Sequence, residues 1–245
     1  MKLYINKIHV WLNGLNDSTS LNSWANGDIE LPNTYALPKP AYYPKTQLRR
    51  LSPFSRVALH CLDMPQVLTA SLPLIFASRH GDLAKTVKLI KDSASGEDLS
   101  PTQFALSVHN ATSGLFGIAT KNTTATTTIS ASKNTFIEGL IEALMQCQKN
   151  HEEVLYCYCD FDVPDEYRQY EEKQPARCIA LLLSAVKSKE TLVSIDLSPN
   201  STLSNKKSVQ SKQETPPCID FIRHMYCQSQ ENIACKNYTL SLGFH

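Results

Sequence analysis

The sequence predicts an α/β layered fold, in which helices pack on a sheet. Short apolar runs rich in β-branched residues, typical of buried strands, alternate along the chain with segments whose apolar residues recur at helical spacing. The length of 245 residues suits one large domain or two small ones. The hydrophobic fraction of 42% and the charged fraction of 19% are typical of a soluble globular protein.

The first part of the chain contains an expected strand, a long loop and a helix. Residues 3–12 are predicted to form the first strand. Residues 13–47 are rich in Asn, Ser, Pro and Tyr and have little periodicity, so we expect a long ordered loop. Ser52 can cap a helix over residues 52–62 that has Pro53 at its first position.

Two strands and two helices are expected next. Residues 72–78 form an apolar run that predicts a buried strand. Asp82 can cap the following helix, whose apolar residues recur at near-helical spacing: Leu83, Val87, Leu89 and Ile90. Residues 126–130 are short and β-branched, which predicts a strand. Residues 134–148 place their apolar side chains on one side, which predicts an amphipathic helix.

The remaining segments predict further strands, a connection and a last helix. Extended segments are expected at residues 154–159, 176–184, 191–197 and 238–244, and a short helix at residues 218–227. Residues 198–216, between the extended segment 191–197 and this helix, are polar and low in complexity, which predicts a flexible connection. The predicted organisation is a domain over residues 1–197, the connection 198–216, and residues 217–245 packed on the same domain.

Composition excludes several classes of function. The 24 basic and 23 acidic side chains give a net charge of +1, so no nucleic-acid partner is expected. No apolar run reaches the roughly 18 residues that span a bilayer, so no membrane span is expected. The N-terminal residues lack the continuous apolar stretch of a signal peptide, which predicts a cytoplasmic location. No sequence feature calls for a cofactor.

The eight cysteines raise the question of disulfides or a metal. Without an export signal, reduced thiols are expected in a chain of this size. Cys157 and Cys159 would point to one face of a strand, but a metal site needs two more ligands at workable spacing and none is evident. We therefore expect buried structural thiols and no metal.

The turn Ala131-Ser132-Lys133 joins an expected strand to an expected helix. A side chain there lies at a helix N-terminus, where backbone N–H groups favour negative charge. A cysteine at this position would become a good nucleophile, whereas Ser132 would need an adjacent general base. A plain helix cap is the simpler interpretation of Ser132, and a hydrogen-bonded core histidine is the simpler interpretation of His109.

Four motifs, in their order and spacing, resemble those of β-ketoacyl synthases. Residues 107–118 resemble the helix before the active site, because Asn110 and Gly114 match the family's Asn-x-x-x-Gly pattern. Residues 54–58 resemble the early Ser-Arg helix, and residues 176–183 resemble the central strand that ends the first half of these enzymes.

The fourth motif contains the expected active-site turn. Residues 127–132 resemble the family's apolar strand ending in Thr-Ala-Cys. Ser130 takes the place of the threonine, Ala131 matches, and Ser132 takes the place of the nucleophilic cysteine. The resemblance covers roughly residues 45–197 and implies half of a thiolase-like layered fold, with helices packed on a mixed sheet.

Two departures from the family matter for function. The nucleophile is missing, and so is most of the second half, which normally carries two catalytic histidines. The part of the chain after residue 197 contains only two histidines, His224 and His245. The resemblance therefore fits a shortened subfamily, the β-ketoacyl synthase-like N-terminal-domain proteins associated with aryl polyene pigment biosynthesis. It implies a non-catalytic, chain-length-factor-like subunit, with no cofactor, that forms a heterodimer with an active ketosynthase and meets acyl carrier protein through that complex.

The resemblance also implies roles for particular residues. Family members dimerise through the strand before the nucleophile and the helix that precedes it, which here gives Asn110, Gly114, Thr126, Thr127, Thr128, Ile129 and Ser130. Left unpaired, this strand is an edge that proteins usually cover, and half a fold leaves one face of the sheet poorly covered. Candidates for limiting chain length at the partner's acyl tunnel are Val108, Leu115 and Phe116, unless Leu115 and Phe116 are ordinary packing. Arg49, Arg50 and Arg56 could receive an acidic carrier protein or form a solvated face.

Two other functions compete with this one. Ser132 could serve a serine acyltransferase or thioesterase, in which case incubation with acyl thioesters should leave an adduct that the Ser132→Ala variant lacks. Alternatively the chain could be a scaffold that binds carrier protein without influencing product length.

Overall fold

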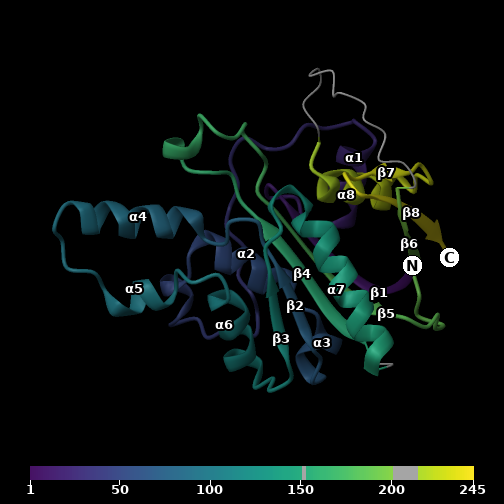
Figure 1. The fold of residues 1–245 in the computed structure, drawn as a ribbon, viewed down its shortest axis with the longest axis horizontal. Coiled ribbons are helices and arrows are strands. Elements are labelled where there is room, and N and C mark those ends of the chain that lie inside the picture. The colour runs from purple at the N-terminus through teal and green to yellow at the C-terminus, as the bar shows by residue number, and fades with distance from the viewer. Residues whose placement is uncertain (151–152, 201–214) are drawn as a thin grey trace.

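The computed structural model describes residues 1–150, 153–200 and 215–245, and these residues form an eight-stranded sheet with helices on its faces (Figure 1). The strand order is β3-β2-β4-β5-β1-β6-β8-β7. The strands are β1 (Lys2–Leu12), β2 (Leu74–Ala77), β3 (Thr126–Ile129), β4 (Val154–Asp160), β5 (Arg177–Ser184), β6 (Val193–Pro199), β7 (Ile233–Ala234) and β8 (Tyr238–Phe244). The long predicted strands are thus all present.

The sheet is mixed, as the resemblance implies. Strands β3, β2 and β4 are parallel, and the remaining neighbours pair antiparallel. Parallel neighbours need crossover helices, and the helices within residues 83–120 and 135–150 supply them before and after β3 in the chain. The carboxyl ends of three parallel strands therefore meet at one edge of the sheet, next to the Ser132 turn.

The helices begin largely where the sequence provides caps. The described α-helices are α1 (Ser18–Ala25), α2 (Pro53–Cys61), α3 (Pro65–Thr69), α4 (Leu83–Ala94), α5 (Pro101–Ala105), α6 (Ala111–Thr120), α7 (Thr135–Asn150) and α8 (Pro217–Cys227). Ser52 accepts a hydrogen bond from the backbone of Ser55 at the start of α2, and Asp82 accepts one from Lys85 at the start of α4. Both predicted caps are confirmed.

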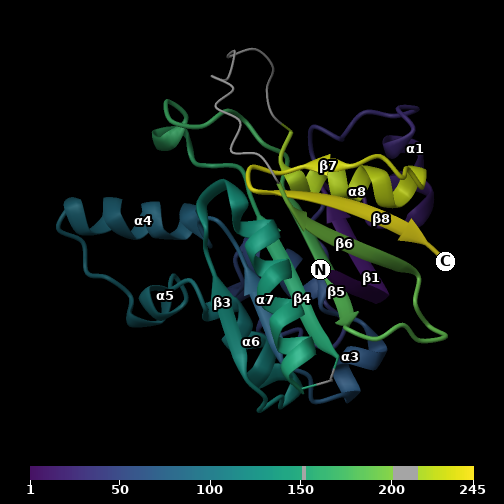
Figure 2. The same cartoon turned by 45° about the vertical axis from the view of Figure 1, so that its right-hand side comes forward.

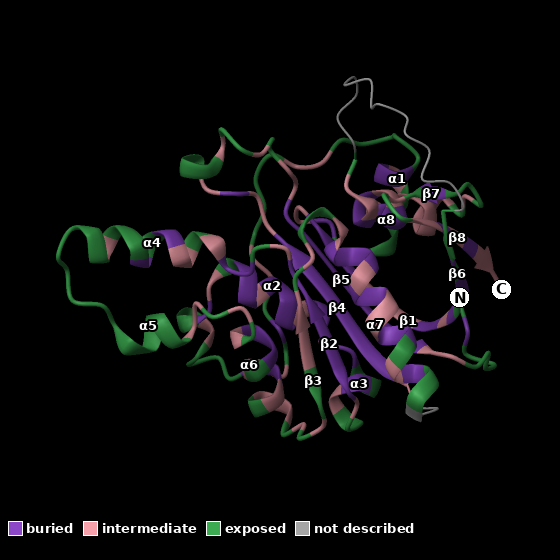
Figure 3. Ribbon diagram, viewed as in Figure 1, coloured by how far each residue is buried: buried purple, intermediate pink, exposed green. Residues whose placement is uncertain are grey.

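Two apolar clusters lie on opposite faces of the sheet. One contains side chains of α1, α7 and α8 packed on the strands, and the other contains side chains of α2, α3 and α6. Figure 2 shows α7 and α8 on the near face of the sheet. Strands β2, β4 and β5 are buried on both faces (Figure 3). They accordingly consist of almost continuous apolar runs.

The C-terminal residues cover part of the face that a missing second half would leave open. Helix α8 packs against α1 and α7, with the rings of Phe136 and Phe221 5.3 Å apart, and β8 pairs with β6. On β6 and β8, the side chains that point away from the cluster of α8 include Asp196, Ser198 and Ser241, which are polar and at least partly exposed. This polar area suits contact with water.

The structure differs from the sequence prediction in the loop expected at residues 13–47. This segment contains α1, which Asp17 caps and which buries Leu21 and Trp24. The guanidinium of Arg223 in α8 lies 4.7 Å from the centre of the Trp24 ring. Because the partner helix lies some 200 residues away in sequence, local periodicity does not reveal α1. The predicted connection at 198–216 lies mostly outside the described residues, and β6 extends through Pro199.

The cysteines are free thiols, and six of the eight are buried. Cys61 and Cys178 join Cys157 and Cys159 in one apolar cluster, with the sulfur atoms of Cys157 and Cys178 3.8 Å apart. Burial raises the pKa of Cys159 to about 11, so this thiol stays protonated and unreactive at neutral pH. Within the described residues, no three His, Cys, Asp or Glu side chains are arranged to hold a metal ion. In that same part of the chain, no helix is long and apolar enough to cross a membrane.

Candidate functional site

The turn after β3 has the strand–turn–helix geometry that the sequence predicts. Ser132 is exposed and lies in the left-handed region with φ of 53°, which is unusual for a residue with a side chain. The buried hydroxyl of Thr135 accepts a hydrogen bond from the Ala131 N–H at 2.9 Å and donates one to the Ser132 carbonyl at 2.7 Å. Thr135 therefore fixes the turn from inside.

The Ser132 hydroxyl has no hydrogen-bond partner among the described residues. The interpretation of Ser132 as a helix cap is therefore wrong: the residue is the first of a short 3-10 turn, Ser132–Asn134, and the cap position belongs to Ala131. A serine nucleophile needs a neighbouring base at about 2.6–3.2 Å, although such contacts can be longer before substrate binds. His224 lies 3.2 Å from the Glu231 carbonyl, and His245 lies 3.2 Å from the amine of Lys187. Neither of these two histidines is hydrogen-bonded to the Ser132 hydroxyl.

A buried polar network joins the carboxyl ends of β2 and β4 close to this turn. Ser78 donates a hydrogen bond of 2.9 Å to the Asp160 carboxylate, which also accepts one of 2.8 Å from the Arg79 N–H. Ser130 donates one of 2.8 Å to the Arg79 carbonyl. The network therefore holds residues 78–81 alongside the end of β3.

Histidines at this edge have structural partners. His109 is half-buried and donates a hydrogen bond of 2.8 Å to the Ser78 carbonyl, so the expected hydrogen bond is present although the residue is not in the core. A Cβ on Gly81 would lie 3.0 Å from the His109 ring, so this position favours glycine, and its φ of 61° does so as well. His80 and Arg79 both contact the Glu171 carboxylate, a pairing that the sequence did not indicate because Glu171 lies in a loop 90 residues away.

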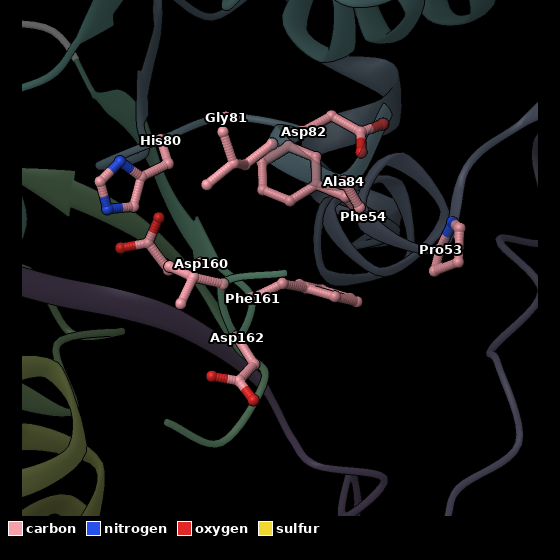
Figure 4. Close-up of a pocket in the computed structure, with 11 residues that line it drawn as sticks. Pro53, Phe54, His80, Gly81, Asp82, Ala84, Asp160, Phe161 and Asp162 are labelled. Atoms are coloured by element: carbon pink, nitrogen blue, oxygen red, sulfur yellow. The ribbon is translucent and has the colours of Figure 1, made fainter. Parts of the chain in front are cut away.

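A small cavity of about 110 Å³ lies beside this network (Figure 4). Phe54 and Phe161 line it, together with His80 and Asp82. Ser132 is not among its lining residues, and the volume is well below the 300–1,000 Å³ that is usual for ligand sites. The cavity therefore does not form an acyl-binding pocket for this turn.

The predicted dimer residues lie at the edge of the sheet and on the outer side of α6. Strand β3 pairs with β2 alone in the described residues, and Thr126, at its start, is exposed. Asn110 and Gly114 are exposed near the start and in the middle of α6. Ile118, one turn after Gly114, is 80% exposed, and sequence reasoning missed it.

The other residues of the predicted edge have mixed environments. Thr127, Thr128 and Ile129 are half-buried, and the Thr127 hydroxyl accepts a hydrogen bond of 3.1 Å from the Gln146 side chain of α7. Ser130 is exposed. A side chain of α7 therefore holds Thr127 in place. No described strand pairs with the backbone N–H and C=O groups on the outer edge of β3.

The three candidates for limiting chain length are not brought together. Val108 is 46% exposed, whereas Phe116 is 1% exposed and lies edge-on to Tyr42 with ring centres 6.1 Å apart. Leu115 is half-buried and lines an open cleft of about 470 Å³ between α5, α6 and residues 43–51. Phe116 is a core side chain, so ordinary packing describes it.

The three arginines also differ. Arg49 and Arg50 are exposed, and Arg50 lines the same cleft as Leu115. Arg56 is half-buried and donates a hydrogen bond of 2.8 Å to the Leu48 carbonyl, which ties α2 to the segment that carries the other two. Arg56 therefore positions this segment.

Comparisons with known proteins agree with this geometry. The sequence model for the β-ketoacyl synthase N-terminal domain matches residues 22–240, which extends the resemblance beyond residues 45–197. A search of the curated proteins finds no match.

Among solved structures, that of a ketosynthase in complex with its chain length factor, from Xenorhabdus doucetiae, is similar with a TM-score of 0.81 and 23% identity, covering 99% of each chain. The ishigamide ketosynthase/chain length factor gives 0.62 at 12% identity, covering 81% of this chain and 68% of that one. A type II polyketide acyl carrier protein in complex with its ketosynthase gives 0.58 at 14%, covering 81% and 70%.

The sheet and its helices are accordingly half of a thiolase-like layered fold, shared with ketosynthases. The chain belongs to the β-ketoacyl synthase N-terminal-domain family.

Proposed function

We propose that the chain is a non-catalytic, chain-length-factor-like subunit that pairs with a complete β-ketoacyl synthase and shapes its acyl tunnel. The observation that carries this proposal is the outer face of α6 beside the edge strand β3, where Gly114 and Ile118 lie exposed. The acyl product is proposed to be of the aryl polyene or polyketide class, and product analysis of the reconstituted pathway tests that part.

The edge strand supports a partner that adds to the sheet. Strand β3 offers one row of unpaired backbone donors and acceptors, and its residues Thr126 to Ile129 are β-branched. Proteins usually cover or charge such an edge, because it otherwise pairs with foreign strands. No charged side chain lies on β3, and β2 is its one neighbour among the described strands, so a partner strand can pair there.

Gly114 supports close approach of a partner to α6. A Cβ built at Gly114 would meet nothing within 4 Å, so the packing of the chain itself does not require glycine there. Glycine inside a helix costs about 1 kcal/mol relative to alanine. A partner whose atoms come close to the helix backbone would explain the missing side chain, and Ile118 beside it would then bury its exposed surface.

The cleft lined by Leu115 supports the role in chain length. It is open and mostly apolar, and Arg50 lines it as well. A bulkier side chain at Leu115 would fill the cleft, so steric overlap there can discriminate between acyl lengths by about 1–3 kcal/mol. Val108 is exposed on the segment that joins α5 to α6, whereas Phe116 supports the helix from within the core.

The Ser132 turn supports the absence of independent catalysis. Its hydroxyl has no base within hydrogen-bonding distance in the described residues, and His224 and His245 have other partners. Arg49 and Arg50 are exposed cations that an acidic carrier protein could contact as it delivers substrate to the complex. Arg56 would act only by holding that segment in place.

Co-purification with a complete synthase encoded in the same genome tests the proposal. Gly114→Leu should abolish the complex while keeping or raising the thermal stability of the chain, because leucine is the better helix former. Asn22→Leu, on the exposed side of α1, is the matched control and should bind like wild type. A wild-type chain that stays monodisperse beside the synthase and never binds it would contradict the proposal.

The length distribution of the acyl product tests the proposed role of the chain in shaping the acyl tunnel. Leu115→Phe should shorten the acyl product of the reconstituted complex, and Leu115→Ala should lengthen it. An unchanged distribution in both variants, with the complex intact, would leave a carrier-protein scaffold as the better description.

A further inference from the structure

The open cleft beside α6 has the size and the walls of a small-molecule site. Its volume of about 470 Å³ falls within the 300–1,000 Å³ that is usual for ligand sites. Three segments form its walls: residues 43–51, α5 and Leu115 of α6. Leucine and proline side chains supply much of the lining, which suits the alkyl part of a ligand: Leu51, Pro101, Leu106 and Leu115.

The polar side chains that line the cleft are all hydrogen-bond donors. They are the guanidinium of Arg50, the amide of Gln47 and the hydroxyls of Tyr43 and Thr102, and none of them makes a side-chain hydrogen bond to another described residue. Tyr43 is 6% exposed, so its hydroxyl lacks a partner although the residue is buried. Burial raises the pKa of Tyr43, so the phenol keeps its proton and remains a donor.

The charge around the cleft favours an anion. No Asp or Glu lines it, and residues 31–62 contain five Lys and Arg side chains and no acidic one. Arg56 uses its guanidinium on the Leu48 carbonyl, whereas Arg50 has no ion pair among the described residues. A cation without an acidic neighbour, at the rim of an apolar cleft, attracts an anionic group that carries an apolar tail.

We propose that this cleft binds a free acyl carboxylate, with its alkyl chain on the leucine walls and its carboxylate at Arg50. The inference rests on the proposed function and deepens it, because it names the class of ligand that regulates the same cleft. A free acid held there would occupy the volume that a growing acyl chain needs. The isolated chain already has the walls and the donors, so it should bind the acid without a partner subunit.

Calorimetric titration of the full chain with three probes of equal length tests the site. Octanoate should bind at least fivefold more tightly than octan-1-ol, and octylamine should bind more weakly than either, because only the acid offers a negative charge to Arg50. Decanoate should bind more tightly than octanoate, by about twofold to fourfold for each added methylene that the cleft buries.

Two variants locate the bound acid. Arg50→Gln should weaken octanoate at least fivefold and leave octan-1-ol within twofold of wild type. Arg49→Gln is the matched control, because Arg49 is an exposed neighbour that does not line the cleft, and it should bind octanoate like wild type. Leu115→Phe should weaken both probes, because the larger ring takes up part of the cleft.

The outcomes separate this inference from the proposed function. No saturable binding of octanoate, equal binding of octanoate and octan-1-ol, or equal losses in the two arginine variants would each overturn the carboxylate site. Octyl phosphate that binds more tightly than octanoate would overturn it as well, because the cleft would then be assigned to a phosphate group. These results leave pairing with a synthase untouched, whereas a chain that binds octanoate and never a synthase would overturn the proposed function alone.

Discussion

The hydroxyl of Thr135 donates a hydrogen bond of 2.7 Å to the backbone carbonyl of Ser132. The same oxygen accepts the Ala131 N–H, so one fully buried side chain bonds both sides of the turn. A left-handed residue with a side chain costs about 1–3 kcal/mol and persists only where the surroundings impose it. Thr135 therefore holds the Ser132 turn in this conformation.

Replacing Thr135 tests this role. Thr135→Ala should lower the free energy of unfolding by about 1–3 kcal/mol, because two backbone groups lose their partner. Thr135→Ser keeps the hydroxyl and should recover most of that loss. Urea unfolding of the three proteins measures the difference, and equal midpoints for the alanine and serine variants would contradict it.

Ser132→Ala should change little. The Ser132 hydroxyl is exposed and makes no hydrogen bond in the described residues, so the free energy of unfolding should stay within about 0.5 kcal/mol of wild type. A non-catalytic subunit also predicts unchanged product formation by the reconstituted complex. Loss of product with an intact complex would instead support the serine acyltransferase, and mass spectrometry would then detect an acyl adduct on the wild-type chain alone.

The seven longer strands were predictable because each has a strong local signal, whereas the two-residue β7 was not predicted. Residues of β4 and β5 form apolar runs, β3 is β-branched, and Ser52 and Asp82 cap helices by their own side chains. Helix α1 was not predictable, because Trp24 gains its partner Arg223 from the other end of the chain. Only the assembled sheet brings those two residues together.

The environment of the candidate site residues was less predictable than the fold. Helix α6 has small or apolar residues on nearly every side, so its pattern does not reveal which face meets the core. In the structure Phe116 points inward, Leu115 lines a cleft, and Ile118 faces outward. The different roles of Arg50 and Arg56 likewise depend on the Leu48 carbonyl, which no sequence motif marks.

Phe116 should behave as a core residue in its own right. Phe116→Ala should lower the free energy of unfolding by about 3–5 kcal/mol, because the ring is 1% exposed and its removal leaves a cavity beside Tyr42. Leu115→Ala, at a half-buried position, should cost less. Thermal or urea unfolding of the isolated variants measures both, and equal losses would contradict the placement of Phe116 in the core.

His60 should make the fold sensitive to mild acid. Its ring stands edge-on to that of His9, 4.8 Å away, and neither ring nitrogen has a hydrogen-bond partner among the described residues. Burial, and to a smaller extent the nearby His9, lower the pKa of His60 to about 4, with Asp63 partly offsetting both. Burial lowers the pKa of His9 as well.

The lowered pKa of His60 decides how the stability of the fold changes with pH. The unfolded chain takes up a proton on His60 near pH 6.5, whereas the folded chain resists protonation until about pH 4, so stability falls as the pH drops through this window. The loss at pH 5 should be about 1–2 kcal/mol once screening by solvent is included. Urea unfolding at pH 7 and pH 5 measures it, and His60→Gln should show a smaller difference between the two. If the variant lost as much stability as wild type, the acid sensitivity would belong to other groups.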